Sequence, residues 1–205
     1  MKLLGTHTSP YVRKARLVLL EKNIPHTYLI DIPTDPGSQV PHVNPLGRIP
    51  ALILDDETCV YDSSVIAEYV DTLNDTPKLI PRHNVMARMR VKRWEALADG
   101  IMDSAIMVRN ERSRPADKQE ADIITQHSAA VSRALAHAAS QLGKHKWCEG
   151  STITLADLAL ASAIVYLDLR LPELGWRALH GDLGAWFARM SVSVQPPHLE
   201  QSSLM

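Results

Sequence analysis

The hydrophobic pattern of this chain changes once, near residue 80, and that change constrains the fold more than any other feature. Before it, short apolar runs typical of strands alternate with helical patterns, whereas after it every apolar pattern is helical. The segment NDTPKLIPRHN (Asn74–Asn84) carries two prolines and no periodicity, which is typical of a linker. We therefore predict a domain of residues 1–75, a linker of residues 76–84 and an all-helical domain of residues 85–205.

The first domain shows strand and helix patterns in the order β-α-β-loop-β-β-α. The expected strands and helices are Lys2–Thr6, Pro10–Lys22, His26–Ile32, Ala51–Leu54, Thr58–Tyr61 and Ser63–Leu73. A three-residue turn joins the last two strands, so they are expected to form an antiparallel hairpin. The segment Pro33–Pro45 is rich in proline and polar residues and predicts a loop with one irregular turn. These patterns indicate a small mixed sheet with helices on its faces.

Helical periodicity also predicts which side chains face inward. In the first domain they are Val12, Ala15, the stem of Arg16, Leu19 and Leu20, followed by Val65, Ile66, Tyr69 and Val70. The helices expected in the second domain are Val85–Glu111, Ala116–Leu142, Thr154–Asp168 and Leu183–Met190. Thr154 and Asp157 have the spacing of a capping box, which we expect to serve folding and not chemistry.

The charge balance argues against several classes of partner. With 22 basic and 23 acidic residues the formal net charge is −1, so no global field attracts nucleic acid or an anionic membrane. The basic run RMRVKRW lacks interleaved aromatic residues and predicts a solvated helix face. No run of eighteen apolar residues predicts a membrane span, and MKLLGTHTSP is too short and too soon polar for a signal peptide.

The reactive residue types give no sign of a metal or disulfide framework. Cys59 and Cys148 are far apart, which fits a reducing compartment, so we expect a cytoplasmic protein. The nine histidines are scattered without metal-ligand spacing, so no metal is expected. The chain also lacks Cys-x-x-Cys, HExxH, P-loop and GxGxxG motifs.

The stretch THTSPYVRKARLVLL places a serine at the start of the first expected helix. Ser9 precedes Pro10, and proline is favoured in a first helical turn, so Ser9 is a good helix cap. A second interpretation is an active site, because a hydroxyl at a helix N-terminus stabilises a bound anion. The neighbouring side chains that offer further donors or positive charge are His7, Thr8, Tyr11 and Arg13.

Two further motifs have both a structural and a functional interpretation. In NPLGRIP, Pro50 is either an ordinary first residue of a strand or part of a cis Ile49–Pro50 bond that leaves the Ile49 backbone free for an extended peptide. In YDSSVIAEYV, Asp62 or Ser63 is expected to cap the following helix. The same helix end suits a carboxylate, and an adjacent Asp suits an ammonium group, so Asp-Ser also predicts a socket for an α-amino acid.

Taken together, these motifs resemble those of cytosolic glutathione S-transferases. The matching stretches are SPYVRKARLVLLEKNIPHTY, NPLGRIPALILDD, YDSSVIAEYV, TITLADLALASAI and GWRALHGDLGAWFARM, which follow the order of the family and cover roughly residues 1–195. The resemblance implies an α/β thioredoxin-like N-terminal domain (β-α-β-α-β-β-α) and an all-α C-terminal domain. It also implies glutathione binding in the first domain, an electrophile pocket between the two domains and a homodimer.

The resemblance implies roles for five residues of this sequence. The backbone of Ile49 is expected to pair with the cysteinyl part of glutathione, with Pro50 in the cis form. Asp62 and Ser63 are expected to hold the γ-glutamyl end. Ser9 matches the catalytic position of Ser-type members of the family, where it would donate a hydrogen bond to the sulfur.

Other positions match the family less closely. The loop Thr34–His42 lacks the basic residue that many members use for the glycyl carboxylate and offers only Gln39 and His42. Asp103 is a loose match for an acid that reaches the γ-glutamyl amine in the partner subunit. The electrophile pocket is expected near the chain end and near Met102, Ile106, Met107 and Arg109.

The implied activity is attack of the glutathione thiolate on a small hydrophobic electrophile. A serine cannot form the mixed disulfides of Cys-type members, so conjugation, glutathione-dependent isomerisation or peroxide reduction is favoured. The alternative functions are therefore a glutathione-dependent peroxidase or isomerase, or a non-catalytic module that kept the fold for binding.

Overall fold

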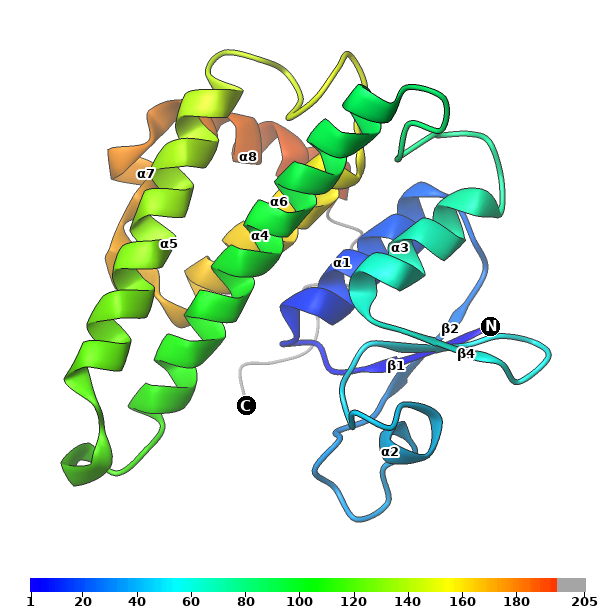
Figure 1. The fold of residues 1–205 in the computed structure, drawn as a ribbon, viewed down its shortest axis with the longest axis horizontal. Helices are drawn as coiled ribbons and strands as arrows, with labels where there is room; N and C mark the ends of the chain where they lie inside the picture. The colour runs from blue at the N-terminus through cyan, green and yellow to red at the C-terminus, as the bar shows by residue number, and fades with distance from the viewer. Residues whose placement is uncertain (195–205) are drawn as a thin grey trace. The chain divides into compact units, whose positions relative to one another are not determined.

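The structure is a computed structural model that describes the backbone of residues 1–194 and the side chains of residues 1–190. Residues 195–205, the end of the predicted helical domain and the chain end expected near the electrophile pocket, lie outside the described residues. The described chain forms two compact units, the sheet unit (Met1–Ile80) and the helical unit (Pro81–Ser193) (Figure 1).

The sheet unit has its elements in the order β-α-β-α-β-β-α, which confirms the order implied by the family resemblance. The elements are β1 (Lys2–Gly5), α1 (Pro10–Glu21), β2 (Thr27–Ile30), α2 (Val40–Val43), β3 (Ala51–Ile53), β4 (Cys59–Tyr61) and α3 (Ser63–Thr72). Strands and helices begin or end up to two residues from their predicted bounds. The predicted irregular turn is the short helix α2.

The four strands form one mixed sheet in the order β2-β1-β3-β4. Strands β1 and β2 run parallel, and α1 connects them, because parallel neighbours need a crossover over one face of the sheet. Strand β3 is antiparallel to both β1 and β4, and β3–β4 is the predicted hairpin. Helices α1 and α3 pack together on one face, and α2 lies on the other (Figure 1).

The buried face of α1 is broader than the predicted stripe. Leu17 and Val18 are buried, whereas Leu20 is 39% exposed although it was expected to face inward. Helix α1 packs against both β1 and α3, so its buried arc is wide and turned away from Leu20. In α3, Val65 is 54% exposed, and Ala67 is buried in its place. The prediction was therefore wrong at Leu20 and Val65.

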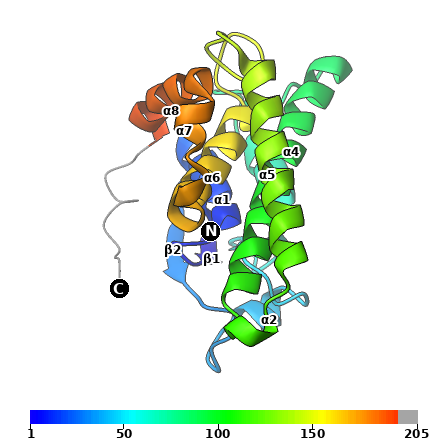
Figure 2. The same cartoon turned by 90° about the vertical axis from the view of Figure 1, so that its left-hand side faces the viewer.

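The helical unit is built around the apolar helix α6. Its elements are α4 (Val85–Arg112), η1 (Ala116–Lys118), α5 (Ala121–Leu142), α6 (Leu155–Arg170), η2 (Pro172–Leu174), α7 (Trp176–Leu179) and α8 (Gly181–Val194). Helix α4 packs against both α5 and α6 (Figure 2). The Asp157 carboxylate accepts a hydrogen bond from the Thr154 N–H at 2.9 Å, which confirms the predicted capping box. The expected helix Ala116–Leu142 is divided into η1 and α5.

Candidate functional site

The register of the sheet brings three chain segments to one end of the sheet unit. Leu4 in β1 pairs with Ala51 in β3, and Ala51 pairs with Tyr61 in β4. The end of β1, the start of β3 and the end of β4 therefore lie at the same end of the sheet. Because neighbouring strands are about 4.8 Å apart, the three segments span roughly 10 Å. An extended tripeptide has about the same length, at about 3.3–3.6 Å per residue.

All five residues of the predicted central site lie on these three segments. Ser9 follows β1, Ile49 and Pro50 directly precede β3, and Asp62 and Ser63 directly follow β4. Residues that are more than fifty positions apart in the sequence are thus brought to one end of the sheet by strand pairing.

Gly5, the last residue of β1, lets the first turn of α1 lie directly on the strand. A Cβ atom at this position would lie 2.4 Å from Val12 Cγ2, so any side chain would displace the start of the helix. Gly5 therefore positions the start of α1, and with it Ser9, through its lack of a side chain. The sequence signal for this role is a glycine that closes the strand pattern KLLG, and it was not among the predicted site residues.

Ser9 caps α1, as its position predicted. Its Oγ accepts a hydrogen bond from the Val12 N–H at 3.3 Å, with φ −74° and ψ 123°. Pro10 has no N–H, and the Arg13 N–H donates to the Ser9 carbonyl at 3.1 Å. Most backbone N–H groups of the first helical turn therefore already have an acceptor in Ser9. The hydroxyl hydrogen of Ser9 remains available for donation, because the oxygen is the acceptor in the cap.

The side chains around Ser9 differ in their surroundings. Thr8 is exposed, and Tyr11 is half-buried. His7 packs edge-on against Tyr28 with ring centroids 5.3 Å apart. Burial, with a further contribution from two nearby arginines of α1, lowers the pKa of His7 below its ordinary value of 6.5, so its imidazole is mainly neutral at pH 7.

Ile49 presents an unused stretch of backbone beside β3. The Ile49–Pro50 peptide bond is cis, as predicted. The Ile49 side chain packs against the core cluster of Leu4, Val40 and Ala51. Among the described residues, the N–H and C=O of Ile49 form no hydrogen bond. A backbone donor and acceptor are therefore free for a ligand.

Asp62 and Ser63 open helix α3. Asp62 is the cap, and its Oδ1 accepts a hydrogen bond from the Ser64 N–H at 2.8 Å. Its φ of 71° lies in a region that costs a non-glycine residue about 1–3 kcal/mol. Ser63 is 5% exposed, and its hydroxyl forms no hydrogen bond with the part of the chain described here. A ligand that reaches this hydroxyl would give it the partner that buried polar groups normally have.

Two side chains that the sequence patterns did not single out brace the site. Buried Lys14 of α1 donates to Ser64 Oγ at 3.3 Å and so joins α1 to the start of α3. Asp31 accepts hydrogen bonds from Ser38 Oγ at 2.6 Å and from the Gln39 N–H at 3.0 Å. Neither residue has a local sequence signal, because each partner lies at least seven positions away.

Gln39 and His42 are both exposed. Gln39 directly precedes the short helix α2, and His42 lies within it. Helix α2 packs beside Ile49 through Val40 and Val43. The two polar residues therefore lie on an element that contacts the Ile49 segment. Their expected contact with the glycyl end of glutathione stays a prediction.

The predicted residues of the helical unit all lie on α4. Asp103, Met107 and Arg109 are exposed, Ile106 is half-buried, and Met102 is buried. Met102 therefore belongs to the core of this unit. The roles predicted for these residues toward a ligand or a partner subunit stay predictions.

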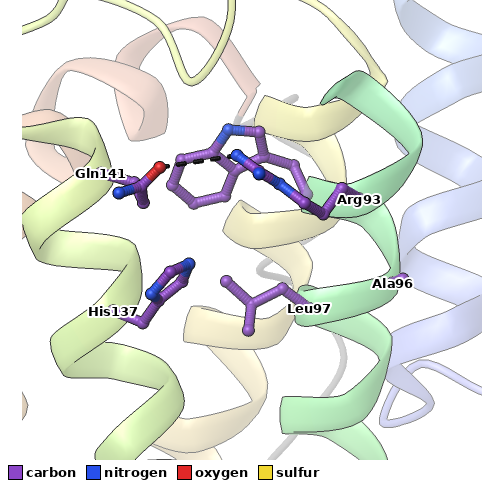
Figure 3. A pocket seen from close by; sticks show the side chains of 6 residues that line it. Arg93, Ala96, Leu97, His137 and Gln141 are labelled. Carbon is purple, nitrogen blue, oxygen red and sulfur yellow. Dashed lines mark hydrogen bonds between the residues drawn. The ribbon is translucent and has the colours of Figure 1, made fainter. Parts of the chain in front are cut away.

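A cavity of about 290 Å³ opens between α4 and α5 within the helical unit (Figure 3). Its lining residues are Arg93, Trp94, Ala96, Leu97, His137 and Gln141. The Arg93 guanidinium donates to the Gln141 side-chain oxygen at 3.5 Å (Figure 3). None of the predicted site residues lines this cavity.

Neither cysteine is an activated thiol. Burial raises the pKa of the Cys148 thiol well above its ordinary value, and burial also raises the pKa of Cys59. Within residues 1–194, no group of three or more His, Cys, Asp and Glu side chains is arranged to hold a metal ion. No described helix is long and apolar enough to cross a membrane.

Comparison with known proteins gives matches to both halves of the chain. A family described as "Glutathione S-transferase, N-terminal domain" matches residues 8–73, and "Glutathione S-transferase, C-terminal domain" matches residues 121–189. The GST-like protein YibF of Escherichia coli K12 is 37% identical over 176 residues, which is 86% of this chain and 86% of YibF. Glutathione S-transferase 3 of Zea mays is 26% identical over 94% of this chain and 89% of its own length.

Solved structures of bacterial relatives have the same fold. A glutathione S-transferase from Methylobacillus flagellatus with glutathione bound is 40% identical, with a TM-score of 0.90 over 93% of this chain and 94% of that one. One from Methylobacterium radiotolerans, in complex with glutathione sulfonate, is 31% identical, with a TM-score of 0.90 over 100% and 97%. The thioredoxin-like domain followed by a helical domain is thereby confirmed. The chain belongs to the glutathione S-transferase family.

Proposed function

We propose that this protein is a glutathione transferase that activates the thiol of glutathione for attack on small hydrophobic electrophiles. The observation that carries this proposal is the placement of Ser9, a capping serine, at the same end of the sheet as Ile49 and Ser63. The latter two supply unpaired backbone and hydroxyl groups. The bound glutathione in the similar protein from Methylobacillus flagellatus supports the choice of ligand.

In the proposed complex, the cysteinyl backbone, the γ-glutamyl end and the sulfur of glutathione each have a separate partner. The free N–H and C=O of Ile49 pair with the cysteinyl backbone, as in an added strand. The start of α3 receives the γ-glutamyl carboxylate through Ser63, because a helix N-terminus carries free N–H groups and partial positive charge. The Asp62 carboxylate attracts the γ-glutamyl ammonium group. The cysteinyl sulfur is then directed toward Ser9.

Ser9 is able to lower the thiol pKa without acting as a base. A free thiol has a pKa of about 8.5, so only about 3% is thiolate at pH 7. A shift of two units requires about 2.7 kcal/mol of preferential stabilisation of the anion. One hydrogen bond to a charged group contributes about 1.5–3 kcal/mol, and a helix N-terminus adds about 0.3–2 kcal/mol. Ser9 stays neutral and donates its hydroxyl hydrogen to the sulfur.

The test is the pKa of protein-bound glutathione, measured by ultraviolet absorbance of the thiolate, in the wild type and in Ser9→Ala. We expect Ser9→Ala to raise the thiol pKa by about 1–2 units, which follows from the loss of one charge-assisted hydrogen bond. The pH dependence of kcat/KM should shift upward by the same amount, because the thiolate is the reactive form. Glutathione affinity should change little, since Ile49 and Ser63 hold the peptide.

Thr8→Ala is the matched variant, because Thr8 offers a second hydroxyl one residue away. If Ser9→Ala leaves the thiol pKa and turnover unchanged while Thr8→Ala raises the pKa, Thr8 is the activating group. If neither variant has an effect, neither of these two hydroxyl groups activates the thiol.

The names of other relatives favour testing a second function, a non-catalytic binding module. They include a stringent starvation protein A homolog from Haemophilus ducreyi (25% identical) and elongation factor 1-gamma from Danio rerio (26% identical). The loop Thr34–His42 has no lysine or arginine, which is expected to weaken binding of the glycyl carboxylate and also favours the non-catalytic function. Calorimetry separates the two functions, since absence of glutathione binding at millimolar concentration excludes the transferase.

The finer parts of the proposal concern substrate class, assembly and location. Peroxide reduction and isomerisation use the same thiolate, and screening peroxides and unsaturated ketones beside aryl halides distinguishes them. We further propose a homodimer in which Asp103 approaches the γ-glutamyl amine bound to the partner subunit. A cytoplasmic location fits the two free cysteines, because thiols stay reduced there.

A further inference from the structure

Helix α1 carries two arginines on the same face as Ser9. Ser9, Arg13 and Arg16 are spaced i, i+4 and i+7, so they form one stripe along the helix. Helical side chains lean toward the N-terminus, which directs both guanidinium groups toward the turn that Ser9 caps. With a rise of about 1.5 Å per residue, Arg13 lies about 6 Å along the axis from Ser9.

Both arginines lack an acidic partner in the part of the chain that the structure describes. Among the described residues, no carboxylate forms an ion pair with Arg13 or Arg16, and the Arg13 side chain forms no hydrogen bond. Both side chains are half-buried. Burial lowers the pKa of each guanidinium, and for Arg13 the neighbouring charge of Arg16 lowers it further. The two guanidinium groups are close together and partly buried, so their positive charges repel each other, and a bound anion would offset this repulsion.

The aromatic ring of Tyr28 in β2 lies beside these arginines. The Arg16 guanidinium lies over the Tyr28 ring, with its central carbon 4.3 Å from the ring centroid, and this contact holds the guanidinium group beside the ring. The Tyr28 hydroxyl is buried and has no hydrogen-bond partner in the described part of the chain. His7 packs edge-on against the same ring and is mainly neutral at pH 7. The group thus combines two cations, an unused hydroxyl and aromatic surface.

We propose that Arg13 and Arg16 bind the carboxylate of the electrophile, so that the preferred substrates are aromatic or unsaturated carboxylates and not neutral molecules. This inference rests on the proposed transferase function and narrows its substrate class. The carboxylate lies between the two guanidinium groups, where bidentate hydrogen bonds form. The apolar part of the substrate then extends along the stripe toward the thiol that Ser9 holds.

The test compares two aryl chlorides, 4-chloro-3-nitrobenzoate and 4-chloro-3-nitrobenzamide, in which the same ring position carries either a carboxylate or a neutral carboxamide. In both reactions the sulfur of the thiolate forms a bond to the ring carbon and chloride leaves with the electron pair of the carbon–chlorine bond. The thiol proton passes to solvent. A change between wild type and variant in the ratio of kcat/KM for the benzoate to kcat/KM for the benzamide therefore reports recognition of the carboxylate, because the intrinsic reactivities of the two rings and the activation of sulfur cancel.

We expect Arg16→Gln and Arg13→Gln each to lower this ratio by about tenfold or more, which corresponds to about 1.4 kcal/mol. The loss should appear mainly in KM for the benzoate. Arg133→Gln is the matched control, because Arg133 is an exposed arginine of α5 outside both proposed binding groups, and its ratio should equal that of the wild type. Added salt should raise KM for the benzoate more than KM for the benzamide.

The outcomes separate this inference from the proposed function. If both substrates are conjugated and the ratio is the same in wild type, Arg13→Gln and Arg16→Gln, the carboxylate site is refuted and the transferase stands. If neither substrate reacts and glutathione does not bind at millimolar concentration, the transferase proposal fails, and calorimetry with unreactive 3-nitrobenzoate then tests the carboxylate site alone. Binding that is lost in Arg16→Gln supports an anion site, whereas equal or absent binding in the wild type and the variant overturns it.

Discussion

Replacing Lys22 by methionine should destabilise the sheet unit strongly. Lys22 is 0% exposed, and its Nζ donates to the carbonyl oxygens of Pro77 at 2.7 Å and of Asn74 at 2.8 Å. It also lies 3.2 Å from Oδ1 of Asp71, whose side chain is nearly as buried. These contacts tie the end of α1 to the segment that follows α3. Methionine keeps most of the aliphatic volume and removes only the charge and its donors.

The expected loss is about 3–5 kcal/mol of unfolding free energy. Removing one partner of a buried ion pair costs about this much, because the remaining Asp71 carboxylate loses the buried ammonium group that lies 3.2 Å from its Oδ1. Part of the cost comes from the charge that stays on the Asp71 carboxylate, so the double variant Lys22→Met/Asp71→Asn should regain about 2 kcal/mol relative to Lys22→Met. A whole domain is stable by only about 5–15 kcal/mol, so the single substitution should remove a large fraction of the stability.

The assay must report on the sheet unit separately. All four tryptophans (Trp94, Trp147, Trp176 and Trp186) lie in the helical unit, so fluorescence follows that unit. Hydrogen exchange of peptides from β1 and α1 measures the opening free energy of the sheet unit directly. Lys2→Met is the control, because Lys2 is exposed, and it should change stability by less than about 0.5 kcal/mol. A loss below about 1 kcal/mol for Lys22→Met would refute the reasoning.

Three further predictions concern individual groups. Arg16→Gln should raise the pKa of His7 toward 6.5, because it removes one of the positive charges that lower it, and an unchanged NMR titration of the imidazole would contradict the arrangement. The Cys148 thiol should stay unreactive toward a disulfide reagent at pH 8 until the protein is unfolded, because burial raises its pKa; rapid labelling of the native protein would disprove this. Asp157→Ala should lower the unfolding free energy by about 2 kcal/mol or more in a urea titration, because the N–H groups of Cys148 and Thr154 lose their acceptor. A loss below about 0.5 kcal/mol would mean that water replaces it.

Local hydrogen bonding made much of the architecture predictable. The caps at Ser9, Asp62 and Thr154 were expected, because each involves atoms no more than three residues apart. The β3–β4 hairpin was expected from its short turn, and the element order and family followed from the motifs. Inward faces were harder to predict, and Leu20 and Val65 were assigned to the wrong side. Periodicity locates an apolar stripe, but the neighbouring elements decide how wide the buried arc becomes.

The candidate site was predictable by residue type but not by arrangement. The motifs identified Ser9, Ile49 and Asp62 as candidates through the family resemblance. Their common position at one end of the sheet depends on the pairing of β1 with β3 and of β3 with β4. Such long-range pairing leaves no local pattern, because strands that are distant in sequence meet only after the chain has folded.

By itself, the sequence determined where the capped helices α1, α3 and α6 start and where strand patterns give way to helical ones, and it predicted which residues offer donors for a thiol peptide. Only the tertiary structure decided that Lys14 and Lys22 are buried, with partners about fifty residues away in and after α3. It also decided that Arg13 and Arg16 lie beside Tyr28 without a counter-ion among the described residues. The physical reason is the same in each case. A helix cap or an apolar stripe depends on residues that are close together in the sequence. The burial of a charged side chain and its ion pairs depend on residues that folding brings next to it from elsewhere in the chain.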